Sequence, residues 1–128
     1  MSNVIENLLE RHLVVAIDNP ESDIASQETA LVRLKLRALS GDKRTSFLSE
    51  YDAIMRTCEM FVMRQGFRFG SMPHLAMNVI VSSVLPAEEI RQISKRRHEV
   101  KKGPVIPSDA EVHRVRGIRL ALAERLDN

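Results

Sequence analysis

The chain has 128 residues, 44% of them hydrophobic, and a formal net charge of +2. This length favours one domain whose core needs neither a disulfide nor a structural metal. The single cysteine, Cys58, excludes an internal disulfide and is typical of a reducing compartment, so we expect a cytoplasmic protein. No apolar run reaches the roughly 18 residues of a membrane helix, and the N-terminus lacks the segments of a secretory signal, so we expect no membrane partner.

Apolar residues recur at helical spacing along most of the chain. In chain order, the predicted helices cover residues 3–17, 23–40, 44–65, 74–84, 86–102 and 109–126. Gly41, Gly66 and Gly103 follow the second, third and fifth of these segments, where glycine commonly ends a helix. Ser108 and Glu111 have the spacing of a capping box at the start of the last segment.

Strand signals are weak, because no Asn-Gly or Asp-Gly hairpin turn occurs, and we expect residues 67–73 to form a loop. The segment 74–84 is apolar on most sides, which favours a central place in the fold. Short connections favour antiparallel neighbours. The predicted fold class is therefore all-α, an up-and-down bundle of four to five main helices with an additional N-terminal helix. Residues 1–128 form one domain, with the N-terminal helix and a linker in 1–22 and the core bundle in 23–126.

The apolar stripes of two predicted helices bear on which side chains are buried. Cys58 lies on the apolar face of the segment 44–65, so we interpret it as a core residue and not as a nucleophile. In the segment 109–126, the stripe leaves open whether Ile118 or Arg119 faces inward.

The segment 86–102 is the most densely basic part of the chain. Its cations are Arg91, Lys95, Arg96, Arg97, Lys101 and Lys102. Such a cluster attracts phosphate groups, so we expect these side chains, Lys95, Arg96, Arg97, Lys101 and Lys102 above all, to contact RNA.

Arg91 and His98 are seven residues apart, so on a helix they point within about 20° of each other and are separated by about 10 Å along its axis. Lys95 lies on the same stripe. A histidine can move a proton near neutral pH, and an arginine can hold a phosphate by two parallel hydrogen bonds. His98 could thus activate a ribose 2′-hydroxyl or protonate the leaving oxygen, while Arg91 stabilises the charge that develops on the phosphate. The alternative is a solvated cationic face with an incidental histidine.

Other candidate groups have structural interpretations. Arg97 falls on or beside the apolar seam of its helix, where we expect it to pair with an acid such as Asp52 or Glu59, or to mark a subunit interface. His74, after Pro73, suits a capping or packing role. No Cys/His cluster, His-Glu-x-x-His pattern or Gly-rich phosphate loop occurs, so we expect no metal and no cofactor.

Several short motifs in this order resemble the HEPN superfamily of small helical proteins, which includes prokaryotic toxins and defence proteins. The resemblance covers about residues 23–126. Its motifs are Tyr51-Asp52-Ala53-Ile54, Gly66-Phe67-Arg68, His74 with Val79-Ile80, Arg91 with His98 six residues between, and Arg96-Arg97-His98-Glu99 before Gly103.

The resemblance implies a metal-independent endoribonuclease in which Arg91 and His98 are catalytic. It implies a homodimer whose two Arg–His pairs face each other across a composite cleft. It also implies a toxin or defence component, held silent by a cognate antitoxin that is sometimes a nucleotidyltransferase. Some members carry a tyrosine shortly after the histidine that an antitoxin modifies. Lys101 and Lys102 occupy that vicinity here, so we do not expect control through such a tyrosine.

Other HEPN proteins have lost catalysis, so two alternatives remain: a non-catalytic RNA-binding module and a protein-interaction module. In both, the basic segment binds its partner without chemistry. The chain has four Phe and one Tyr, which offers little surface for stacking single-stranded bases. This composition argues against sequence-specific readout by this chain alone.

Overall fold

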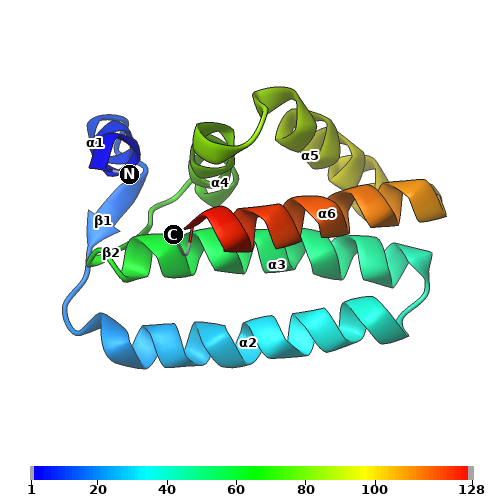
Figure 1. Cartoon of the computed structure of the whole chain (residues 1–128), viewed down its shortest axis with the longest axis horizontal. Coiled ribbons are helices and arrows are strands. Elements are labelled where there is room, and N and C mark those ends of the chain that lie inside the picture. The colour runs from blue at the N-terminus through cyan, green and yellow to red at the C-terminus, as the bar shows by residue number, and fades with distance from the viewer. Residues whose placement is uncertain (1, 127–128) are drawn as a thin grey trace.

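Six helices and two short strands follow one another through residues 2–126, which are the residues that the computed structural model describes (Figure 1). In chain order they are α1 (Ser2–Glu10), β1 (Val14–Ala16), α2 (Pro20–Ser40), α3 (Lys43–Met63), β2 (Phe67–Phe69), α4 (Pro73–Val84), α5 (Ala87–Lys102) and α6 (Asp109–Leu126). The predicted all-α class is thus confirmed except for a small sheet.

Helix α3 lies at the centre of the fold and contacts α2, α4, α5, α6 and β2. Its largest fully buried hydrophobic side chains are Phe47, Tyr51, Ile54 and Val62. Cys58 is also fully buried, and burial raises the pKa of its thiol, so its interpretation as a core residue is confirmed. The central place predicted for the segment 74–84 is wrong, because α4 buries one side and leaves Leu75, Ser82 and Ser83 exposed.

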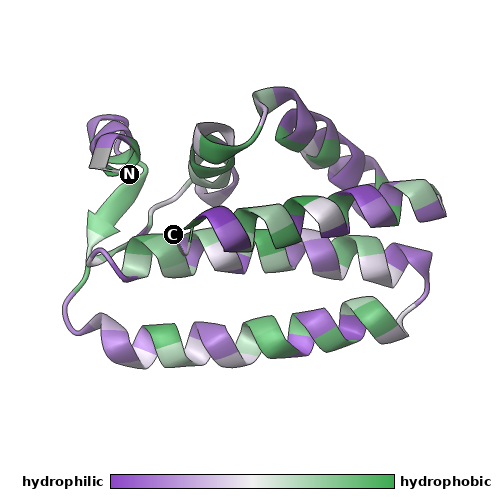
Figure 2. Cartoon of the chain, viewed as in Figure 1, coloured by the Kyte–Doolittle hydropathy of each residue, from purple (hydrophilic) through white to green (hydrophobic). Residues whose placement is uncertain are grey.

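Helices α2 and α3 form an antiparallel hairpin, and α6 lies beside α3 and runs in the same direction as α3 (Figure 1). Helix α5 runs back in the opposite direction, so the chain direction alternates between α2, α3, α5 and α6. The helical conformation is interrupted between α4 and α5 at Leu85. The backbone of Leu85 is extended, which is the conformation favoured before a proline, and Pro86 follows. Figure 2 shows α5 as largely hydrophilic and α4 as largely hydrophobic.

The N-terminal segment departs from the prediction of one helix over 3–17. Helix α1 ends at Glu10, His12 adopts a left-handed backbone conformation with φ 56°, and β1 then pairs antiparallel with β2 in the register Val14↔Phe69. The loop predicted for 67–73 is accordingly wrong over Phe67–Phe69. Val14 and Phe69 are both buried, so the pairing supplies apolar burial and backbone partners that local periodicity does not encode.

The predicted capping box of α6 is confirmed. The backbone N–H of Glu111 donates to the Ser108 hydroxyl at 3.2 Å, and the backbone N–H of Ser108 donates to the Glu111 carboxylate at 2.9 Å. Gly41 follows α2 as predicted, but with an extended backbone. A Cβ at Gly41 would come within 2.6 Å of the Thr45 side chain, so the glycine is needed for the close approach of α2 and α3.

A buried carboxylate joins α3 to α6. Glu50 is fully buried and accepts hydrogen bonds from Arg116, at 2.5 Å, and from Arg119. Ile118 and Arg119 are both buried, so the choice that the apolar stripe left open is resolved in favour of both residues. Because two guanidinium groups contact Glu50, its charge is compensated inside the protein.

Candidate functional site

Helix α5 attaches to the rest of the protein through Ile90, Ile93 and Val100, which are buried. Arg91 and His98 are both exposed, and the helix is continuous between them. Since seven residues make nearly two turns, the two side chains leave the helix on the same side. The outer face of α5, by which we mean Arg91, Lys95, His98 and Lys102, is therefore open to solvent.

Arg91 has an intramolecular partner on this face. Its guanidinium donates to the Glu88 carboxylate at 2.8 Å, and both side chains are more than half exposed. Gln92 also donates to Glu88 and accepts a hydrogen bond from Arg114. Exposed ion pairs of this kind contribute about 0–1 kcal/mol, so a phosphate group can compete for Arg91.

The other cations of α5 divide into two groups. Arg96 donates to Glu111 at 2.5 Å and to Glu99 at 3.4 Å, which ties α5 to α6. The hydrogen bond from Arg96 is the main reason why the pKa of Glu111 is lowered. Within the described part of the chain, the ammonium groups of Lys95, Lys101 and Lys102 form no ion pair, so they are the cations of α5 best placed to bind an external phosphate.

The C-terminal end of α5 is held by α3. Arg44 donates to the backbone carbonyls of Val100 and Lys101, both at 3.1 Å. These carbonyls belong to the last turn of the helix, where backbone acceptors lack partners within the helix. Arg44 therefore fixes the end of α5 from which Lys102 projects.

Arg97 does not form the predicted ion pair with Asp52 or Glu59. Its guanidinium carbon lies 5.0 Å from the centroid of the Tyr51 ring, a cation–π arrangement. Its Nε is buried and has no hydrogen-bond partner among the described residues. Glu59 instead lies beside Arg56 and accepts a hydrogen bond from Gln27.

Tyr51 is the centre of a polar network that joins α3, α4 and α5. Its hydroxyl lies 3.2 Å from Nδ1 of His74 and 3.2 Å from Oγ of Ser94. The Tyr51 and His74 rings are stacked with their centroids 6.0 Å apart. Ser94 in turn donates to Oδ1 of Asn78 at 3.3 Å.

One arrangement of protons satisfies all three contacts of this network with Oδ1 of Asn78 facing Ser94. The Ser94 hydroxyl donates to Asn78, the Tyr51 hydroxyl donates to Ser94, and the Tyr51 oxygen accepts a hydrogen bond from Nδ1–H of His74. This arrangement leaves Nε2 of His74 as an acceptor. The pKa of His74 is lowered by burial and by the charges of Arg97 and Lys101, against the opposing effect of Asp52.

Sequence reasoning found parts of this network. Tyr51, His74 and Arg97 all belong to the HEPN-like motifs, and the structure brings the three together. Ser94 and Asn78 were missed. The spacings of Ser94 to Arg97 and of His74 to Asn78 place each pair on one helical face, but which helix that face meets is decided by tertiary packing.

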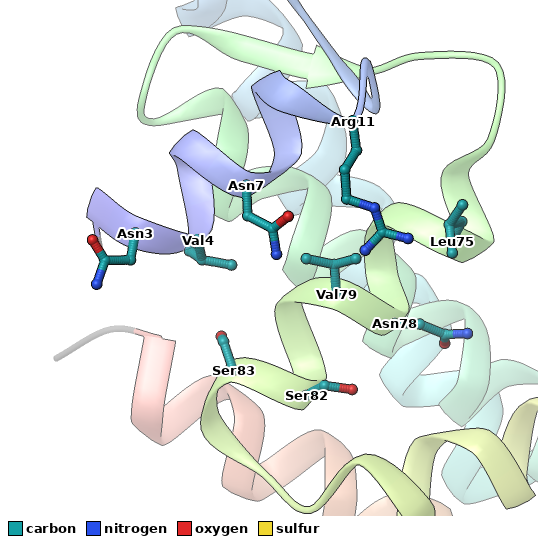
Figure 3. A pocket seen from close by; sticks show the side chains of 9 residues that line it. All are labelled: Asn3, Val4, Asn7, Arg11, Leu75, Asn78, Val79, Ser82 and Ser83. Carbon is teal, nitrogen blue, oxygen red and sulfur yellow. The ribbon is translucent and has the colours of Figure 1, made fainter.

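A groove between α1 and α4 borders the network (Figure 3). It has a volume of about 450 Å³ and is lined by three carboxamides, two hydroxyls, one guanidinium and three aliphatic side chains: Asn3, Asn7, Asn78, Ser82, Ser83, Arg11, Val4, Leu75 and Val79. Figure 3 shows the Arg11 side chain extending from the end of α1 toward Leu75 and Asn78 of α4. Asn78 belongs to both the groove and the Tyr51 network.

Within residues 2–126, no three His, Cys, Asp or Glu side chains gather in a way that could hold a metal ion. The described helices also include none with the length and apolar character needed to cross a bilayer. Comparison with protein-family models, with curated proteins and with solved structures finds no match to this chain. A functional assignment therefore depends on the side chains of α5 and the residues around them.

Proposed function

We propose that this protein is a cytoplasmic, metal-independent endoribonuclease of the HEPN type that cleaves RNA with Arg91 and His98, as a toxin or defence component. The observation that carries the proposal is the outer face of α5. It presents Arg91 and His98 on one side of a continuous helix, next to Lys95 and Lys102, which have no ion-pair partner in the described residues.

The chemistry follows from these groups. His98 removes the proton of a ribose 2′-hydroxyl, whose oxygen attacks the adjacent phosphorus. The bond from phosphorus to the 5′-oxygen breaks, and that oxygen takes a proton from His98 of a second subunit, which leaves a 2′,3′-cyclic phosphate. Arg91 stabilises the negative charge on the phosphate during this step. The proposal thus includes a homodimer in which two Arg–His pairs share one cleft.

The Tyr51 network supports the proposal indirectly, because it holds the helix that carries Arg91 and His98. Arg97 stacks on Tyr51 and Ser94 contacts its hydroxyl, so two residues of α5 fix the helix against α3. A catalytic pair needs such support, since small displacements of reacting groups are costly in rate.

The test is cleavage of a labelled RNA in the presence of EDTA by the whole chain and by two variants. We expect His98→Ala and Arg91→Ala each to lower the cleavage rate at least 100-fold, the lower range of general acid–base contributions. His113→Ala is the matched control, because His113 is an exposed histidine on α6. Far-UV circular dichroism checks the fold, and sedimentation equilibrium measures the dimer. Undiminished cleavage by both variants would overturn the proposal.

A non-catalytic RNA-binding module is the second candidate. The observation that favours it is the set of three lysines Lys95, Lys101 and Lys102, which are exposed and form no ion pair among the described residues, so they can contact phosphates without any step at His98. In this case RNA binding should weaken steeply with salt, and His98→Ala should leave the affinity unchanged. The cleavage assay separates the two candidates, because this one predicts RNA binding by the whole chain without cleavage.

A further inference from the structure

A second pocket, separate from α5, lies between α2 and α3 and has a volume of about 350 Å³. Three arginines line it: Arg33 and Arg37 from α2, and Arg56 from α3. The lining also includes the carboxylate of Asp52 and the apolar side chains of Ala30, Leu34 and Met55. Sequence reasoning did not single out the arginines, because they stand in two different helices.

Two of the three arginines of this pocket have no counter-ion among the described residues. Arg33 and Arg37 are one helical turn apart on the same side of α2, and neither guanidinium forms an ion pair or a hydrogen bond within the described part of the chain. Arg56 donates to Gln27 at 2.7 Å and lies 4.0 Å from Glu59, so its position is fixed from outside the pocket. The pocket thus holds two unpaired guanidinium groups, one guanidinium group paired from outside, and the carboxylate of Asp52.

We propose that this pocket binds a phosphate monoester carried on a sugar. A phosphate monoester has a charge of about −1.5 to −2 at pH 7, so it can satisfy both unpaired arginines, Arg33 and Arg37, whereas a phosphodiester carries one negative charge. Arg33 and Arg37 bind the phosphate oxygens, since the guanidinium fork suits phosphate geometry. Asp52 accepts a hydrogen bond from a sugar hydroxyl, and Leu34 and Met55 contact the carbon skeleton.

This chemistry has two sources, a free sugar phosphate and the 5′-phosphorylated end of an RNA strand. The second source rests on the proposed ribonuclease function and would make the pocket a sensor of the RNA end. Binding is measured with the full chain carrying His98→Ala, so that the RNA stays intact. The result then does not depend on whether the chain cleaves RNA.

The experiment is calorimetric titration with ribose 5-phosphate, inorganic phosphate and unphosphorylated ribose. We expect ribose 5-phosphate to bind most tightly, and Arg33→Gln and Arg37→Gln each to weaken it at least tenfold. Lys35→Gln is the matched control, because it removes one positive charge from the same helix but lies outside this pocket, and it should change the affinity less than twofold. Asp52→Asn should weaken ribose 5-phosphate and not inorganic phosphate.

Competition with short RNAs identifies the source. If a 5′-phosphorylated RNA displaces ribose 5-phosphate and a 5′-hydroxyl RNA does not, the pocket takes an RNA end. If neither RNA displaces it, the ligand is a free sugar phosphate. Two results would overturn the proposal: the absence of binding to ribose 5-phosphate and to 5′-phosphorylated RNA, and an equal loss of affinity in Lys35→Gln and Arg33→Gln, which would indicate unspecific attraction.

Discussion

The hydroxyl of Tyr51 links three helices, because it reaches His74 of α4 and Ser94 of α5 from its position on α3. The consequence for His74 is chemical as well as structural. In the proton arrangement that satisfies all of these contacts, Nδ1–H donates to Tyr51, and Nε2 is left to accept a proton or a hydrogen bond. His74 is an exposed residue, so this acceptor belongs to a side chain that reaches the protein surface.

Titration of His74 tests this assignment. We expect ¹H–¹⁵N spectra to show the Nδ1–H form and a pKa below the ordinary value of 6.5. Because the folded pKa is lowered, the unfolded state binds more protons between the two pKa values. The contribution of His74 to stability is therefore fully present above pH 6.5 and is lost as the pH falls through the folded pKa.

Tyr51→Phe removes the hydrogen-bond partner of His74 Nδ1. The imidazole should then no longer favour the Nδ1–H form, and the free energy of unfolding should fall by about 1 kcal/mol. An unchanged tautomer in Tyr51→Phe would contradict the assigned network.

At the scale of helices and strands, local signals predicted the ends of elements better than their partners. The end of α3 near Gly66, whose φ is +92°, and the capping box of Ser108 and Glu111 at the start of α6 were both predicted. Both features depend only on residues that are close together in the sequence. The strand β1 was missed because its pairing with β2 joins segments about 50 residues apart, and no local pattern encodes that contact.

In the candidate site, too, positions within one helix could be predicted from the sequence, whereas contacts between helices could not. Arg91 and His98 could be placed on one face from the helical repeat alone. The position of Arg97 over Tyr51 could not, because it depends on how α5 packs against α3. The arginine pocket between α2 and α3 could likewise not be predicted from the sequence. Helical spacing places Arg33 and Arg37 on one face of α2, but it does not show that Arg56 of α3 lies beside them.

The ion cluster between α3 and α6 is the element-scale feature with the largest expected effect on stability. Glu50→Ala leaves Arg119 buried without its counter-ion, and removal of one partner from a buried pair costs about 3–5 kcal/mol. Arg116 is more exposed and can turn to solvent, so we expect the lower end of that range. Urea unfolding measures the change. Lys43→Ala, which breaks the exposed pair with Asp109, is the control and should cost less than 1 kcal/mol. An equal loss in both variants would show that Glu50 does not hold α3 to α6.

At the scale of the whole molecule, the positive charge that could attract RNA is concentrated on α5 and is not a property of the net charge. The net charge is only +2, so any strong attraction of RNA must be local. Arg96 and Arg97 are used to fix α5 to α6 and α3, respectively, through Glu111 and Tyr51. On α5, the cations left for an external phosphate are Lys95, Lys101 and Lys102, with Arg91 available if it leaves Glu88.

This arrangement predicts the salt dependence of RNA binding. For single strands, the logarithm of the binding constant falls with the logarithm of the salt concentration with a slope of about −0.7 per neutralised phosphate. Three or four cations therefore predict a slope of about −2 to −3. Lys95→Ala should reduce the steepness by about 0.7, because one phosphate contact is lost, whereas Arg96→Ala should reduce it little, since Arg96 is bound to Glu111 and Glu99. Fluorescence anisotropy of a labelled RNA from 50 to about 300 mM salt measures both slopes. A larger effect of Arg96→Ala than of Lys95→Ala would mean that RNA contacts the side of α5 toward α6 and not its outer face.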